Sequence, residues 1–129
     1  MNAVNFVEIN ELLTEWAAND PPIEDFTVEN VMFALRLDED SYDFILKYLM
    51  SKKDFELIPK KMLLCPSNHK VESFDLEEPI EDEFFECFCG EIDFMPENFL
   101  LVFQFTEQFK SQSQKKKNQA KSLRQLILV

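Results

Sequence analysis

The chain has 129 residues, 46% of them hydrophobic, and a formal net charge of −12. This length supports one hydrophobic core and is too short for two ordinary domains. The sequence contains one glycine, so the glycine-rich phosphate loops of P-loop and Rossmann proteins are excluded.

The sequence carries no signal for membranes or export. No apolar stretch approaches the ~20 residues that a membrane-spanning helix needs. The N-terminus also lacks the basic flank and apolar block of a signal peptide. Three cysteines, an odd number, argue against a secreted disulfide framework and fit a reducing compartment. We therefore expect a soluble, cytoplasmic protein with no membrane partner.

Charge is divided unevenly along the chain. Residues 110–129 hold six basic side chains and no acidic one, which leaves residues 1–109 with 25 acidic against 7 basic side chains, a net charge of −18. An acidic body repels phosphate, so the counterion release that drives nucleic-acid binding would be missing there. Contact with an anionic partner is expected through the basic tail.

Apolar residues at helical spacing mark the first part of the chain. The pattern predicts an amphipathic helix within residues 1–20, ended by two prolines. Thr27 is a candidate N-cap for a second helix over 27–37, and an acidic turn leads into a third over 40–57. Residues 25–58 are therefore expected to form a helix pair.

From residue 60 the apolar period changes from helical to alternating. The alternation predicts short strands around residues 62–64, 71–74 and 84–85 and a longer final strand. Four side chains share one face of that last strand: Phe99, Leu101, Phe103 and Phe105. We expect a small antiparallel sheet over residues 60–109, which completes a single α+β domain over residues 1–109.

All three cysteines and the one histidine fall in a single window of 25 residues. They form two close pairs, Cys65 with His69 and Cys87 with Cys89. Four thiolate or imidazole ligands satisfy Zn²⁺ in a tetrahedron, and two short-spaced pairs on facing hairpin tips supply them without a large core.

The second pair has two local features that suit a metal. In an extended Cys-x-Cys both side chains point to one face, so both sulfurs could reach one ion. Gly90 follows the pair and permits the backbone to fold closely around a metal. The sequence therefore predicts a Zn²⁺ site on four residues: Cys65, His69, Cys87 and Cys89. The plainer alternative is three buried cysteines that act as small hydrophobes beside a surface histidine.

The connection between the two pairs is strongly acidic. It carries eight carboxylates: Glu72, Asp75, Glu77, Glu78, Glu81, Asp82, Glu83 and Glu86. A carboxylate run could bind Ca²⁺, but this one lacks the Asp/Asn/Gly spacing of a calcium loop. A solvated loop that repels nucleic acid or attracts a basic partner is the favoured interpretation.

Residues 110–129 form a basic tail that ends in an apolar segment. The polar, lysine-rich composition of residues 110–119 predicts a mobile or weakly helical linker. Leu123, Leu126 and Ile127 could dock as a short helix on this chain or on another one. The alternative is a frayed end.

Helices followed by strands that carry a Cys-Pro-x-x-His and a Cys-x-Cys-Gly pair resemble a winged-helix domain with a zinc ribbon inserted in or appended to its wing. Small accessory proteins of bacterial and phage conflict systems have this arrangement. The resemblance covers roughly residues 25–108. It implies a structural zinc on the four predicted ligands and no catalytic residues.

DNA-reading members of such a family carry Arg, Lys, Asn or Gln along the recognition helix and basic residues in the wing. Here the corresponding residues 41–50 contain one lysine, and the wing region is acidic. These departures disfavour DNA reading.

Two functional classes are therefore disfavoured. An enzyme could use a Cys65–His69 dyad, or a zinc-bound water with Glu91 as base, but four occupied ligand positions leave no open site, and no HExxH motif is present. A winged-helix nucleic-acid-binding regulator would bind phosphates through the basic tail, while the negative charge of residues 1–109 would repel them. Its phosphate contacts would be Lys115, Lys116, Lys117, Lys121 and Arg124.

The favoured class is a non-catalytic adaptor or regulatory subunit in which zinc fixes a protein-binding surface. The chain has 14 phenylalanines, more than so small a core easily hides, so some are expected to contact another protein. That partner could be a basic or nucleic-acid-binding protein. A homodimer through the first helix or the apolar end is a further expectation.

Overall fold

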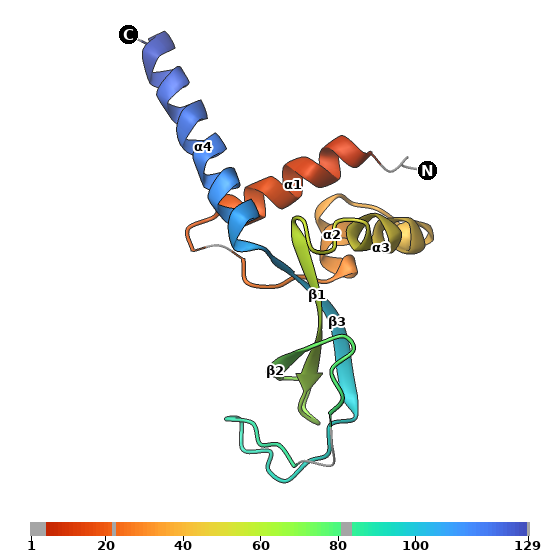
Figure 1. The fold of residues 1–129 in the computed structure, drawn as a ribbon. Helices are drawn as coiled ribbons and strands as arrows, with labels where there is room; N and C mark the ends of the chain where they lie inside the picture. The colour runs from red at the N-terminus through yellow and green to blue at the C-terminus, as the bar shows by residue number, and fades with distance from the viewer. Residues whose placement is uncertain (1–4, 22, 81–83, 129) are drawn as a thin grey trace. The chain divides into compact units, whose positions relative to one another are not determined.

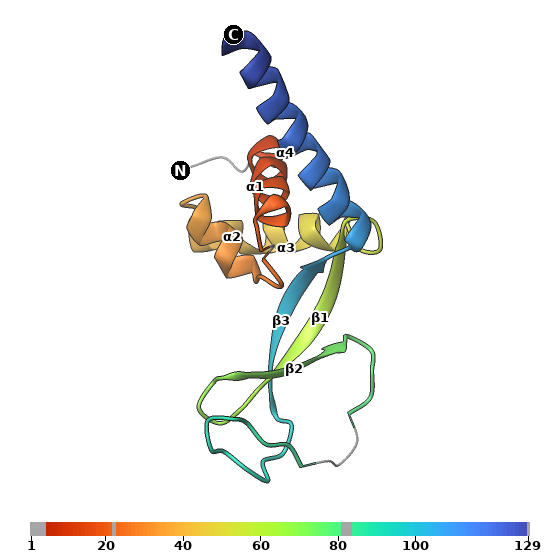
Figure 2. The same ribbon diagram turned by 90° about the vertical axis from the view of Figure 1, so that its left-hand side faces the viewer.

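The computed structural model describes residues 5–21, 23–80 and 84–128, with side chains described as far as residue 120. Figures 1 and 2 show its helices and strands. In chain order they are α1 (Phe6–Ala18), α2 (Val28–Ala34), the 3-10 helix η1 (Glu39–Ser41), α3 (Tyr42–Met50), β1 (Leu57–Leu64), β2 (Lys70–Asp75), β3 (Asn98–Phe105) and α4 (Glu107–Leu128). The predicted α+β class is confirmed.

The chain divides into two compact units. One consists of Met1–Ile58 with Gln104–Val129 and is mainly helical, and the other is Pro59–Phe103, which holds most of the sheet. We call them the helical unit and the sheet unit. The expected single domain that ends at residue 109 stays a prediction.

Side-chain caps set the starts of the first two helices. The Asn5 side chain accepts a hydrogen bond from the Val7 N–H at 2.8 Å. Thr27 caps α2 as predicted, because its hydroxyl accepts from the Asn30 N–H while the Asn30 side chain accepts from the Thr27 N–H. Such a reciprocal box satisfies two backbone donors that the helix itself leaves unpaired.

Apolar residues at helical spacing build the core of the helical unit. Ile9 and Leu13 on α1 and Ile45 and Leu49 on α3 are fully buried. The ring of Phe26 lies 5.3 Å from Trp16 and 5.2 Å from Phe105, measured between ring centroids. This aromatic packing joins segments that are far apart in the sequence.

The third helix is shorter than its apolar pattern predicts. It was expected over 40–57 but ends at Met50, and β1 already begins at Leu57. Asp54 has a φ of 70°, which a right-handed helix cannot accommodate. Leu57 is fully buried as the first residue of the strand. Burial of the strand therefore outweighs the local helical pattern.

The sheet is antiparallel, as predicted, and has three strands. Its strand order is β2-β1-β3, with β1 central. The strand expected around residues 84–85 is reduced to an isolated bridge between Phe85 and Phe94. Strands β1 and β2 pair in the register Lys61↔Phe74 and Leu63↔Glu72 and have an irregularity between Leu63 and Leu64. This irregularity immediately precedes Cys65, where the chain leaves the sheet.

The C-terminal segment is helical where a mobile or weakly helical linker was expected. Helix α4 contains residues 110–119, and the Thr106 hydroxyl accepts from the Phe109 N–H at its start. Phe109 and Ser113 are buried, one helical turn apart. The Gln114 side chain donates to the Ala18 carbonyl at the end of α1. Contact with α1 thus holds a polar sequence in a helix.

Long apolar helices are missing from the part of the chain that the structure describes. No helix there combines the length and the hydropathy that crossing a membrane requires.

Candidate metal centre

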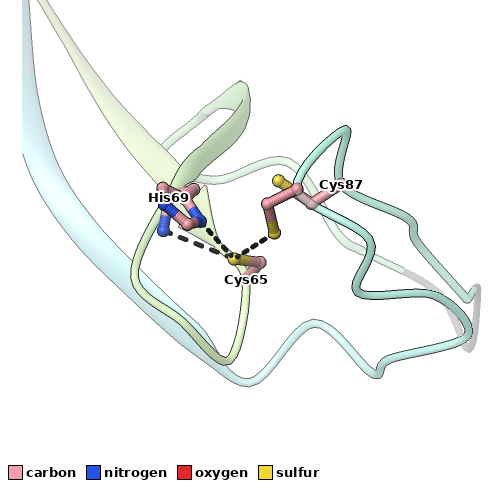
Figure 3. Close-up of side chains that lie close together, drawn as sticks. Cys65, His69 and Cys87 are labelled. Carbon is pink, nitrogen blue, oxygen red and sulfur yellow. Dashed lines mark hydrogen bonds between the residues drawn. The ribbon is translucent and has the colours of Figure 1, made fainter.

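The four predicted ligands come together in the sheet unit. Their ligand atoms all lie within 4.8 Å of one another, close enough to hold a metal ion. Cys65 and Cys87 are buried, whereas His69 and Cys89 are exposed. Figure 3 shows Cys65, His69 and Cys87 gathered between two loops of the chain. The clustering goes beyond what three cysteines acting as small hydrophobes require.

Two of the distances match the edges of a coordination tetrahedron. With metal–sulfur bonds of ~2.3 Å and metal–nitrogen bonds of ~2.0–2.1 Å, an ideal tetrahedron has sulfur–sulfur edges of about 3.8 Å and sulfur–nitrogen edges of about 3.5 Å. The Cys65 Sγ lies 3.7 Å from the Cys89 Sγ and 3.5 Å from the His69 Nδ1. These side chains are therefore placed for one ion, with Nδ1 as the imidazole donor.

The first ligand pair lies in a tight turn between β1 and β2. The Cys65 N–H donates to the His69 carbonyl at 2.9 Å, and the Asn68 N–H donates to the Cys65 carbonyl at 2.8 Å. Asn68 has a φ of 66°. Asparagine tolerates this left-handed region better than most residues, so the turn closes without a glycine.

The second pair repeats this backbone pattern. The Cys87 N–H donates to the Glu91 carbonyl at 2.7 Å, and the Gly90 N–H donates to the Cys87 carbonyl at 3.0 Å. Gly90, the fourth residue of the turn like Asn68, has a φ of 107°. The expectation of an extended Cys-x-Cys is therefore wrong. A turn, and not an alternating strand, brings the Cys87 and Cys89 sulfurs to one point.

An apolar floor supports both turns. Leu63 and Phe94 form a buried cluster with Cys65 and Cys87. Partly buried side chains pack against this cluster: Val71, Phe74 and Phe85. Phe85 and Phe94 exchange two backbone hydrogen bonds, at 3.0 and 3.1 Å, so the second turn sits at the end of a short paired segment. One ligand of each pair is thereby held in the core.

Two further hydrogen bonds fasten the first turn to its surroundings. The Ser67 hydroxyl donates to the Glu91 carboxylate at 3.2 Å, which links the two turns directly. The Asn98 side chain donates to the Asn68 side chain at 3.0 Å, which links the first turn to the start of β3. Sequence reasoning missed Ser67, Asn68 and Asn98. The Asn at the fourth turn position was the one available signal, because Asn is enriched at positive φ.

The cysteine thiols compete for ionisation. Burial raises the pKa of the Cys65 thiol, but hydrogen bonds from the backbone N–H groups of His69 and Ser67 outweigh this effect, and its pKa is lowered to about 7. The Glu91 N–H lowers the pKa of Cys89, yet removal from water and the neighbouring thiols raise it more, so its net pKa is raised. A thiolate on Cys65 disfavours a second one beside it. A bound divalent cation would remove that conflict.

The other predicted site residues lie on α4. Lys115, Lys116 and Lys117 are exposed, and the Lys117 Nζ lies 3.4 Å from the Ala18 carbonyl. Five predicted residues have side chains outside the described part of the structure: Lys121, Leu123, Arg124, Leu126 and Ile127. Three carboxylates of the acidic connection, residues 81–83, also fall outside it. Binding roles for these groups stay predictions.

Comparison of the chain with protein-family models, with curated proteins and with solved structures found no match.

The positive φ of Gly90 gives a prediction about metal affinity. A Cβ added there meets nothing within 4 Å, so Gly90→Ala should cost only backbone strain, ~1–2 kcal/mol. We expect the affinity for Co²⁺, used as a spectroscopic probe, to fall about 5–30-fold. Competition with a chelator measures it.

Asn68→Gly is the matched control for Gly90→Ala. It changes the equivalent position of the other turn in the direction that relaxes the backbone, but it also removes the side chain that accepts from Asn98. Its Co²⁺ affinity should therefore be no lower than that of Asn98→Ala, which loses the same hydrogen bond. Equal Co²⁺ affinity in Gly90→Ala and the unmodified chain would show that the second turn does not need its observed conformation.

Proposed function

We propose that the four-residue cluster holds a structural Zn²⁺ and that the chain acts as a non-catalytic protein-binding adaptor or regulatory subunit. The observation that carries the proposal is the approach of three sulfurs and one imidazole nitrogen within 4.8 Å. Soft thiolates with one imidazole suit Zn²⁺, whereas Mg²⁺ and Ca²⁺ prefer oxygen ligands. The donor set thus favours Zn²⁺ over these hard cations.

A ligand set of this kind favours a structural role. Four protein ligands complete the tetrahedron, while catalytic zinc sites keep a position for water or substrate. The Glu91 carboxylate, the candidate base, accepts the Ser67 hydroxyl and so has a local structural task. Both points support a non-catalytic protein.

The winged-helix and zinc-ribbon assignments belong to the same proposal. Three α-helices and the 3-10 helix η1 precede β1, and the metal turns lie between β1 and β3. This order is the one expected of a winged helix whose wing carries an inserted zinc ribbon. It supports a winged-helix-like chain in which the metal shapes the wing.

Phe88 is the best candidate for the contact with a partner. It is 92% exposed, although it stands between the ligands Cys87 and Cys89. A metal on both neighbours would fix its backbone, and a rigid aromatic side chain loses little entropy on binding. Phe84 and Ile92, 67% and 62% exposed, lie near it in sequence. We call these three residues the turn patch.

The charge around the turn patch indicates what the partner offers. Residues 71–109 contain no lysine or arginine, while Glu86, Glu91 and Asp93 flank the second turn. Three thiolates, one neutral imidazole and Zn²⁺ add a further net charge of about −1. An apolar pocket edged by Lys or Arg therefore complements this surface.

The zinc part of the proposal predicts one zinc per chain in protein purified without a tag. Cys65→Ser removes a buried ligand, so zinc affinity should fall by more than the ~10–100-fold typical of changes beyond the first coordination shell. Elemental analysis measures the zinc content per chain, and chelator competition measures the zinc affinity. Pro66→Ala, an exposed non-ligand in the same turn, is the control and should keep the metal. Zinc well below one per chain in the unmodified protein would contradict the site.

The binding part of the proposal predicts that Phe88→Ala loses a stoichiometric protein partner in native-source cross-linking and purification, while zinc content stays at one per chain. Loss of a central aromatic anchor typically costs ~2 kcal/mol or more. The control is Phe55→Ala, since Phe55 is 75% exposed and lies in the helical unit. If no protein other than the chain itself is recovered, or if Phe55→Ala loses the partner equally, the adaptor role of the turn patch is refuted.

A further inference from the structure

An open groove of about 1100 Å³ runs between α1 and α4 within the helical unit. Small side chains line part of it, among them Ala18, Ser113 and Ala120, and two glutamates of α1 and two lysines of α4, Lys116 and Lys117, line the rest together with polar neighbours. Val7 is 60% exposed at one end, whereas Ala18 and Ser113 are buried where the two helices meet. The groove is therefore wide, with a floor of small side chains at its closed end.

Among the described side chains of α4, the buried ones lie in its first turns. Phe109 and Ser113 are buried, but every residue from 115 to 120 is exposed, and the helix continues to Leu128. Figures 1 and 2 show it extending past α1. A helical segment of this length is marginal in water on its own. The exposed residues 115–120 of α4 thus have room to pack on a further surface.

The two walls of the groove differ in charge. Helix α1 carries three glutamates and no basic residue, and Glu11 and Glu15 line the groove. From residue 110 onward α4 carries six basic residues and no acidic one. In the chain's own α4, Lys117 lies near the Ala18 carbonyl at the far end of α1. The acidic wall of α1 is therefore complementary to a second basic helix of the same kind as α4.

The lengths also agree. Helix α1 has 13 residues, which is ~20 Å at 1.5 Å per residue, and residues 115–128 of α4 span ~21 Å. In the sequence of that part, Leu123, Leu126 and Ile127 recur three and four residues apart, the spacing of one helical stripe.

We propose that the chain forms a homodimer in which α4 of each copy lies in the α1/α4 groove of the other. The groove and α4 belong to the same unit. A two-fold axis therefore places α4 of each copy in the groove of the other at the same time, and the assembly closes as a dimer. Glu11 and Glu15 of one copy then face basic α4 residues of the other. This dimer requires neither the metal ion nor the turn patch, so it stands apart from the function proposed above.

The test is a charge exchange followed by analytical ultracentrifugation of the full chain. The unmodified chain should sediment at twice its 15.3 kDa at micromolar concentration. Glu11→Lys/Glu15→Lys and Lys115→Glu/Lys116→Glu should each raise the dimer dissociation constant about tenfold or more, because like charges then face each other. An equimolar mixture of the two variants should restore the dimer. Glu39→Lys/Asp40→Lys, the same charge change on exposed η1 residues, should leave dimerisation unchanged.

Two results would overturn the proposal: a monomeric unmodified chain, or a dimer that both exchanges leave intact. If an exchanged variant does not fold, the sedimentation of the unmodified chain still tests the proposal, because a monomer would overturn it. Carbodiimide cross-linking of a mixture of ¹⁴N- and ¹⁵N-labelled chains should join Glu11 or Glu15 of one copy to an α4 lysine of the other. Cross-links within single chains only would reject the groove as the interface.

Discussion

The meeting of three sulfurs and one imidazole nitrogen at a single point is the constraint on which the sheet unit depends. A three-stranded sheet over a small apolar cluster buries little surface, and units of this size commonly need a metal or a disulfide for stability. The only cysteines of the chain are the three in this cluster. A divalent cation would let these thiols ionise together and would tie the two turns to the sheet.

The repeated backbone pattern of the two turns explains how so few residues hold the ligands. In each turn the first cysteine is bracketed by two backbone hydrogen bonds, and the fourth residue, Asn68 or Gly90, takes a positive φ. The side chains of Cys65 and Cys87 enter the apolar floor, while their partners His69 and Cys89 close the site from the solvent side. The same arrangement leaves Phe88 exposed between Cys87 and Cys89, which is why we propose it as the contact with another protein.

The four residues of the cluster could be predicted from the sequence because soft donors are rare in this chain and metal coordination tolerates few substitutes. The local geometry was harder to predict. An extended strand and a turn both bring the sulfurs of Cys87 and Cys89 to one side, so residue type alone does not distinguish them. The end of α3 was mispredicted, and the regular helix over residues 110–119 was only partly anticipated, for a different reason. Each depends on burial against distant parts of the chain, at Leu57 and at Ser113, which local spacing does not report.

X-ray absorption at the zinc edge, on protein purified without a tag, tests the central claim most directly. A closed site predicts three sulfur neighbours at ~2.3 Å and one nitrogen neighbour at ~2.0–2.1 Å. A first shell that contains an oxygen in place of one of these four donors would contradict a closed structural centre and reopen the case for chemistry at the metal.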